Sequence, residues 1–181
     1  MTTNSTRILV GLIGRVFWMR VEGKGTHLNS LQAKSVFQRI MAKGIHDLVV
    51  DLERCPMMDS TFLGMLTGTA LNVKKVNAAG SLSVLNANQR NIQLLNSLGL
   101  NHILEIDSDA TMWATERERA VAALKLCENC DPAPKEVQTQ HVLDTHQILS
   151  DVSSENECRF RDVIDFLEKE LEAHTADPLP A

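Results

Sequence analysis

The chain has 181 residues, a formal net charge of −5 at pH 7, and a hydrophobic fraction of 44%. This length and apolar content suffice for one packed domain and an appendage, without disulfides or metal to hold the core. The basic residues form no cluster, which argues against nucleic-acid binding, because that needs a basic face to neutralise phosphates. No apolar run approaches the roughly 20 residues that cross a bilayer, and the start lacks a signal-peptide core, so we expect an intracellular protein without a membrane span.

The first part of the chain alternates strand and helix patterns. The expected elements are strands at 7–13 and 16–21 joined as a hairpin, a helix capped by Asn29 or Ser30 that ends before Gly44, a strand at 46–52, a helix at 60–78, a strand at 81–85, a helix at 88–98 and an edge strand at 102–106. Apolar residues at i, i+3, i+4 and i+7 give each helix one inward face. This order predicts an α/β fold with a mixed β-sheet layered with α-helices.

The rest of the chain is predicted to be helical. We expect a helix at 109–127, in which Trp113, Ala120, Val121 and Leu124 are candidate packing positions, and then a linker at ENCDPAPK. Helices at 136–150 and 155–173 form a C-terminal α-helical hairpin, and Ser154 with Glu157 fits a capping box at the start of the second. The apolar faces of this hairpin must be covered by the domain, by each other or by another chain. The predicted organisation is a domain at 1–107, a helix and linker at 108–135, and the hairpin with a tail at 136–181.

The cysteines and histidines do not predict a metal site. Cys127 and Cys130 form one C-x-x-C pair, and no second pair stands at a suitable spacing. His141 and His146 follow, but residues at i and i+5 do not share a helix face well. We therefore expect helix-end thiols, surface histidines, and neither a metal nor a cofactor.

One segment stands out between the strand at 46–52 and the helix that follows it. Asp59-Ser60-Thr61 opens that helix, and Gly64 lies one turn further on. A hydroxyl at a helix N-terminus meets unpaired N–H groups and the positive end of the helix dipole, so a phosphoryl group there would be stabilised. It would also add a charge of about −1.5 to −2. From spacing alone the simpler interpretation is an N-cap by Asp59 or Ser60, worth ~1 kcal/mol.

The segment also carries a family signature, and residues 7–107 resemble the STAS domain, the fold of anti-sigma-factor antagonists. Members have a strand ending in Asp or Asn, a short loop, and then Met-Asp-Ser-Ser/Thr-Gly-Leu-Gly at the start of a helix. This chain has Val50-Asp51-Leu52, followed by Met58-Asp59-Ser60-Thr61-Phe62-Leu63-Gly64. Phe62 stands where the family pattern usually has Gly, and we expect it to enlarge the surface beside Ser60.

The resemblance implies a function. In that family the Ser after the Asp is phosphorylated by an anti-sigma factor that is also a serine-protein kinase, and a metal-dependent serine phosphatase resets it. The unphosphorylated antagonist binds the anti-sigma factor and frees the sigma factor. Carried over, Ser60 is the phosphoacceptor, Thr61 is a weaker candidate, and Asp59 takes part in kinase recognition. The chain would then be a cytoplasmic bacterial partner-switching protein in transcription regulation, with no catalysis of its own.

The same resemblance places the loop at 23–30 beside Ser60. The residues expected to contribute to partner binding are Thr26, His27, Asn29, Asp59, Thr61, Phe62 and Gly64. For the three in the loop, a solvated loop that ends in an N-cap is an equally good interpretation.

Two other functions stay open. An enzyme with Ser60 as nucleophile needs a base within hydrogen-bond reach and an oxyanion hole. The segment has no G-x-S-x-G, no histidine is convincingly placed, and His46 lies at the far end of the preceding strand. A closed pocket with an imidazole beside Ser60 would favour the enzyme, and an open convex surface the switch. The other alternative is a scaffold or sensor subunit assembled through the C-terminal helices, for example as a homodimer.

Overall fold

A mixed sheet forms the centre of the molecule. The computed structural model describes residues 6–128 and 133–176, and in these the strand order is β5-β4-β3-β2-β1-β6. The strands are β1 (Arg7–Ile13), β2 (Val16–Glu22), β3 (Asp47–Asp51), β4 (Ser81–Leu85), β5 (Glu105–Ile106) and β6 (Lys125–Leu126). The first two form an antiparallel hairpin and β2 to β5 run parallel, so the predicted mixed sheet is confirmed.

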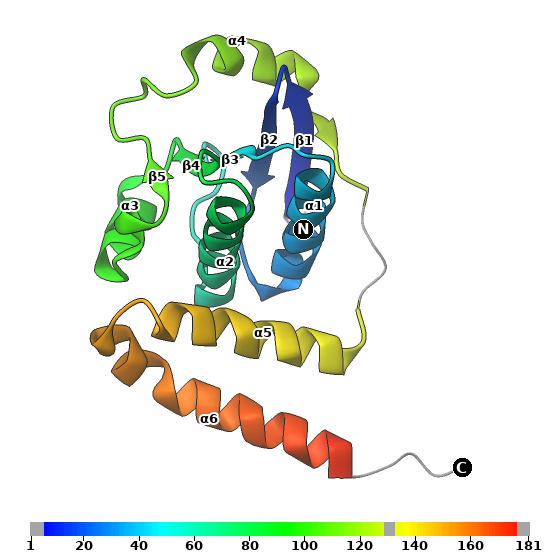
Figure 1. Ribbon diagram of the computed structural model, residues 1–181, viewed down its shortest axis with the longest axis vertical. Coiled ribbons are helices and arrows are strands. Elements are labelled where there is room, and N and C mark those ends of the chain that lie inside the picture. Colours follow the sequence, from blue (N-terminus) through cyan, green and yellow to red (C-terminus); the bar gives the residue numbers. More distant parts are fainter. Residues whose placement is uncertain (1–5, 129–132, 177–181) are drawn as a thin grey trace, which may run out of the picture.

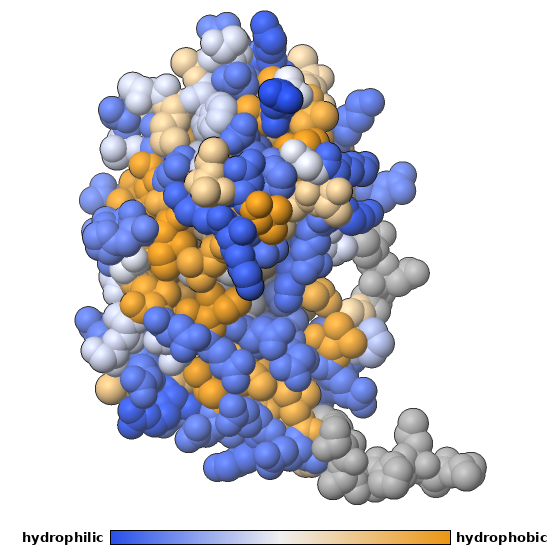
Figure 2. All heavy atoms as spheres, viewed as in Figure 1, coloured by the Kyte–Doolittle hydropathy of each residue, from blue (hydrophilic) through white to orange (hydrophobic). Residues whose placement is uncertain are grey.

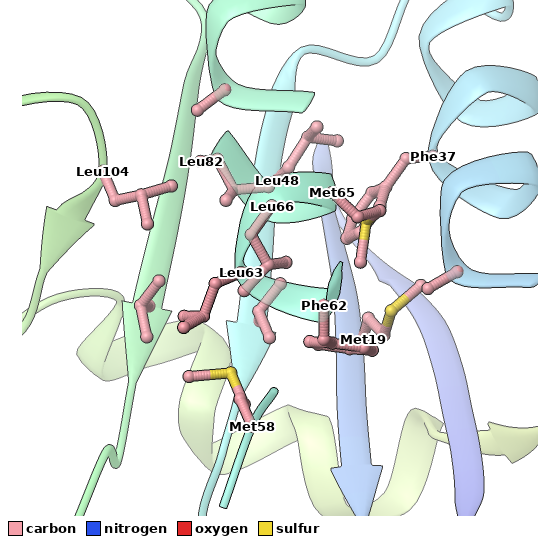
Figure 3. Packing of buried hydrophobic residues seen from close by; sticks show 14 of the residues in the cluster. Met19, Phe37, Leu48, Met58, Phe62, Leu63, Met65, Leu66, Leu82 and Leu104 are labelled. Atoms are coloured by element: carbon pink, nitrogen blue, oxygen red, sulfur yellow. The ribbon is translucent and has the colours of Figure 1, made fainter. Parts of the chain in front are cut away.

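Helices cover both faces of the sheet (Figure 1). They are α1 (His27–Ala42), α2 (Ser60–Val76), α3 (Gln89–Ser97), α4 (Ala114–Ala123), α5 (Lys135–Ser150) and α6 (Ser154–Ala176), with a short 3₁₀ turn at Leu100–His102. The larger apolar cluster joins one face of the sheet to α1, α2 and α3. Figure 3 shows part of it, with Phe37, Phe62 and Leu66 directed toward the strands. The smaller cluster contains Trp18 and Val49 on the other face, where Ala120 of α4 packs against them.

Two predicted element boundaries are wrong. The first helix is preceded by Thr26, not by Asn29 or Ser30, because Asn29 Oδ1 accepts the Thr26 N–H at 3.0 Å and closes the first turn earlier. The predicted helix at 109–127 begins only at Ala114, because Trp113 has a left-handed backbone with φ of 56°. Its packing face is also narrower than predicted, since Val121 is 73% exposed.

The chain after α4 adds a strand that the sequence did not predict. Lys125 and Leu126 form β6, which pairs antiparallel with β1 through Val10 and Leu9. Two residues are too short to show a strand pattern, so the exposed edge of β1 decides their conformation. Between residues 108 and 126, therefore, the chain covers the sheet and extends it.

The predicted C-terminal hairpin is confirmed, and it packs on the domain. Helix α5 lies across α1 and α2, and α6 packs on α5 (Figure 1). At the turn, Asn156 Nδ2 donates to the carbonyl of Leu98 at 3.0 Å. The cap of α6 is Ser153, whose Oγ accepts from Asn156 N, not the predicted Ser154. The inward faces of both helices are thus covered within the chain, while many hydrophilic residues cover the hairpin in Figure 2.

Within the part of the chain that the structure describes, no helix has both the length and the apolar character to span a bilayer.

Candidate functional site at the start of helix α2

A buried carboxylate anchors the loop that leads to Ser60. Asp51 ends β3 with no exposed surface. Its Oδ2 accepts from Arg20 Nε at 2.8 Å and Trp18 Nε1 at 3.2 Å, and its Oδ1 accepts from Asn86 Nδ2 at 2.8 Å. A buried charge is tolerated only when it is paired and fully hydrogen-bonded, as it is here. These bonds fix the point at which the chain leaves the sheet toward α2.

The predicted loop does lie beside the site, and Asp59 joins the two. Asp59 Oδ1 accepts the N–H of Phe62 at 2.9 Å, which caps α2. Its Oδ2 accepts the N–H of His27 at 2.9 Å, and the backbones of Gly25 and Met58 form a bridge next to it. A Cβ at Gly25 would stand 2.9 Å from the Phe62 ring, so this close approach requires glycine.

The three predicted loop residues differ in exposure. The His27 side chain is 56% exposed, and its Nδ1 lies 3.6 Å from Asp59 Oδ2. Asn29 is buried, and its Nδ2 donates to the carbonyl of Lys24 at 2.9 Å. Thr26 is partly buried at the start of α1. Of the three, His27 has the most exposed side chain, while Asn29 holds the loop in shape.

Ser60 is the first residue of α2, and its side chain is partly buried under α5. Its Oγ lies 2.9 Å from Nε2 of His146. The other ring nitrogen of His146, Nδ1, lies 2.7 Å from the carbonyl oxygen of Val142. A carbonyl only accepts, so Nδ1 carries a proton, and in the neutral ring Nε2 accepts the hydroxyl proton of Ser60.

Sequence reasoning missed His146, and the prediction of surface histidines is wrong for both histidines of α5. His146 is 5% exposed and His141 is 3% exposed. The i, i+5 separation, which argued against a shared site, lets them reach different helices, since His141 Nε2 lies 2.8 Å from Ser30 Oγ on α1. No local pattern reveals a contact between residues 86 positions apart. The available signal was the presence of two histidines among the apolar residues of a predicted helix.

Several predicted partner residues are covered in this structure. Thr61 is 4% exposed, and Phe62 is fully buried in the core, where Figure 3 shows it near Met19. The prediction that Phe62 enlarges the surface beside Ser60 is therefore wrong, because its ring fills the space over Gly25. Gly64 is also buried, with Thr145 of α5 directly against it. Of the two candidate acceptors, Ser60 is the more accessible.

The site has one of the two features that an enzyme would need. An imidazole does lie within hydrogen-bond distance of Ser60. However, two cavities beside α5, of about 200 and 370 Å³, are lined by side chains other than those of Ser60 and His146, and the smaller lies between α1, α2 and α5. Asp59 also occupies the N–H of Phe62, a backbone donor that an oxyanion hole at this helix start would need.

The described residues include no group of three His, Cys, Asp or Glu side chains placed to hold a metal ion. Cys127 is partly buried, and Cys130 lies outside the described residues. Burial raises the pKa of the Cys55 thiol, which reduces its reactivity.

Solved structures with a similar fold support the description of the chain as a mixed sheet layered with helices. An anti-sigma factor antagonist from Mycobacterium paratuberculosis superposes with a TM-score of 0.53 and 16% identity, over 67% of this chain and 97% of its own. The unphosphorylated form of the antagonist SpoIIAA gives a TM-score of 0.50 and 19% identity, over 62% of this chain and 97% of its own. A protein from Thermotoga maritima superposes with a TM-score of 0.53 and 18% identity, over 60% of this chain and 92% of its own.

A search of curated proteins finds no match to this chain. The family model of the STAS domain matches residues 8–118. These residues cover β1, apart from Arg7, and β2 to β5, and they end before α5. With the mixed sheet and the loop–helix geometry at Ser60, this match shows that the chain belongs to the STAS domain family.

Proposed function

We propose that this protein is a phosphorylation switch of the anti-sigma-factor antagonist type, acting in the bacterial cytoplasm without catalysis of its own. In its unphosphorylated form it binds an anti-sigma factor that is also a serine-protein kinase. Phosphorylation of Ser60 ends that binding, and a metal-dependent serine phosphatase restores it. The proposal rests on one observation, which is the position of the Ser60 hydroxyl at the first residue of α2, beside the Asp59 cap and the loop at 23–30.

The local chemistry suits a phosphoryl group. The first turn of a helix presents N–H groups and a positive dipole end, which favour an anion. A phosphoryl group adds about −1.5 to −2 charge to a surface whose only nearby carboxylate, among the contacts described for this loop, is Asp59. A partner patch that fits the neutral hydroxyl would meet a doubly charged group instead.

The transfer itself requires ATP and the kinase. The Ser60 oxygen attacks the γ-phosphorus of ATP, and the bond between that phosphorus and the β,γ-bridging oxygen breaks. ADP leaves, and the hydroxyl proton passes to a base of the kinase. The phosphatase reverses the state by hydrolysis, in which water replaces the serine oxygen on phosphorus and inorganic phosphate leaves.

Intact-mass spectrometry after incubation with a purified anti-sigma-factor kinase of the same organism, Mg²⁺ and ATP tests the proposal. We expect the addition of one phosphoryl group to the full chain, mapped to Ser60. Ser60→Ala should remove the labelling. Thr61→Val removes the neighbouring hydroxyl but keeps the shape of the buried Thr61 side chain, so labelling should be retained. Equal labelling of Ser60→Ala, or labelling that follows Thr61, contradicts the assignment.

Two alternatives have less support. Assembly through the C-terminal helices has little apolar surface available, because Leu143, Leu149 and Phe160 face inward. Among the described residues of the hairpin, the exposed large hydrophobic side chains are those of Val137 on α5 and Phe166 on α6. Catalysis by Ser60 and His146 would need a substrate cavity, and the two cavities beside α5 are lined by other side chains.

A further inference from the structure

We infer that the α5–α6 hairpin is a displaceable cover over Ser60, which the kinase must move aside and which a phosphorylated Ser60 holds away. This inference rests on the proposed function and names the regulation of the same site. The hairpin lies after residue 118, where the STAS family match ends, so it is an addition to the part of the chain that carries the acceptor.

The first support is the fit between α5 and α2. At Gly64 a Cβ would lie 2.3 Å from the carbonyl oxygen of Thr145 and 2.8 Å from its Cβ, so the two backbones touch where the glycine has no side chain. One turn on, Gly68 is covered by the tip of Ile148, whose Cδ1 would stand 2.8 Å from a Cβ added there. The face of α2 that follows Ser60 is therefore occupied by the chain itself.

The second support is the contact at Ser60. A kinase has to bring the γ-phosphorus of ATP to within about 3–3.5 Å of the attacking oxygen, in line with the leaving group. Nε2 of His146 already stands 2.9 Å from that oxygen. With the hairpin docked, the imidazole blocks that side of the Ser60 oxygen.

The product is also incompatible with the docked arrangement. Phosphorylation replaces the hydroxyl proton that lies between Ser60 Oγ and His146 Nε2 with a tetrahedral group bearing three further oxygens. A separation of 2.9 Å holds one hydrogen and cannot hold that group. Because α2 and α5 already touch at Gly64 and Thr145, α5 makes room for this group by moving away from α2. Phosphorylation thus favours the displaced hairpin.

The interface is built so that it can open at one end. At the turn, Leu149 and Phe160 belong to the main apolar cluster, and Asn156 bonds to the carbonyl of Leu98. Over α1 the contacts are polar, with Ser30 on His141 and Lys34 Nζ 4.0 Å from Asp144 Oδ2. The cavity of about 200 Å³ between α1, α2 and α5 lies beside these polar contacts and includes Lys34 and Asp144 in its lining. Polar, incompletely packed contacts separate at lower cost than an apolar cluster.

Thiol reactivity at position 60 tests the cover without any kinase. The full chain carrying Ser60→Cys is treated with a maleimide, and the rate of labelling at residue 60 is followed by peptide mass mapping. Gly64→Ala in the same chain drives a methyl group into Thr145 and should undock α5, so we expect labelling at least about tenfold faster. Exposed Cys158 gives an internal reference rate in every sample.

The matched control is Gly68→Ala. It makes the same substitution one turn later on the same helix, but the added methyl meets only the flexible end of Ile148, which can turn away. We expect its labelling rate to stay within about twofold of the parent chain. Leu149→Asp, on α5 itself, provides a second opening variant if Gly64→Ala loses the native fluorescence of buried Trp18.

The outcomes separate the cover from the switch. Equal labelling rates in the parent, Gly64→Ala and Leu149→Asp chains would show that α5 does not shield position 60, and would overturn the inference. The proposed function would survive that result if the kinase still phosphorylated Ser60. Conversely, an accelerated thiol reaction with no phosphorylation in either opened chain would support a cover and contradict the switch. Phosphorylation that is faster in Gly64→Ala than in Gly68→Ala supports both.

Discussion

At the scale of single residues, the site depends on a few polar side chains with two partners each. Asp59 shows this most clearly, because one carboxylate caps α2 through Phe62 and holds the backbone of His27 in the neighbouring loop. The family signature contains this Asp, and the cap alone would account for it. The second bond, to another segment, is what keeps the loop at 23–30 beside the acceptor.

Asp59→Ala is therefore expected to lower the free energy of unfolding by about 1–2 kcal/mol, measured by urea denaturation. Both N–H groups lose their acceptor, so the value lies toward the upper part of the range for helix caps. Asp59→Asn retains an acceptor oxygen for Phe62 and should lose less than half as much. An Asp59→Ala chain as stable as the parent chain would show that the cap contributes little.

At the same scale, Asp51 shows how the sequence pattern and the structure agree. The signature places an acid at the end of the strand, and the structure buries it among Trp18, Arg20 and Asn86. The strand and its acid were predictable from sequence. The partners of the Asp51 carboxylate were not predictable, because Asn86 lies 35 residues away, directly after the end of the neighbouring parallel strand β4.

At the scale of elements, the contact between α5 and α1 is expected to depend on pH. Burial lowers the pKa of His141 to about 4, and Lys34 acts in the same direction while Asp144 opposes it. Those two charged groups face the ring, and Ser30 on α1 contacts it. In the imidazolium both ring nitrogens carry protons, and Nδ1 has no hydrogen-bond partner among the described residues.

The sign of the effect follows from the two pKa values. Because the docked value lies below the ordinary value of about 6.5, the undocked or unfolded state binds more protons between pH 6.5 and 4. Docking is therefore strongest above pH 6.5 and weakens as pH falls toward 4, by up to about 3 kcal/mol. The maleimide rate at Ser60→Cys, corrected by Cys158 at each pH, measures this.

His141→Gln should flatten that pH dependence, because glutamine keeps a polar side chain but does not titrate. His102→Gln, at an exposed position, serves as the control and should retain the parent profile. A profile that is unchanged in His141→Gln would remove His141 as the cause.

At the scale of the whole molecule, the chain consists of a sheet with buried central strands and an appended hairpin held on one side. Leu48, Val49 and Val50 of β3 and Val84 of β4 have no exposed surface. The hairpin packs mainly on helices of the domain and on the segment after α3. Segments with fewer buried contacts open more often than the core does.

Amide hydrogen exchange should show this difference. We expect amides of α5 and α6 to exchange at least about tenfold faster than those of β3 and β4, with the fastest exchange toward the end of α5 that lies over α1. Ser60→Glu, which places a carboxylate under His146, should accelerate exchange in α5 further. Uniform protection across hairpin and sheet would show that the molecule opens only as one unit.

The sequence by itself determined the α/β order, the central strand, the inward helix faces, the family signature around Ser60 and the presence of a C-terminal hairpin. These follow from periodicity and from short local motifs, in which the residues that decide the structure are neighbours in the chain. The end of the first helix before Gly44, whose φ is 79°, is local information of this kind.

Only the tertiary structure decided where the hairpin lies, that His146 covers Ser60, that Phe62 faces the core, and that Lys125 and Leu126 join the sheet. Each of these depends on surfaces brought together from distant parts of the chain: an α2 face with glycines at 64 and 68, a space over Gly25, and the open edge of β1. Close packing selects among many amphipathic alternatives, and a single helix pattern carries no information about which surface it will meet.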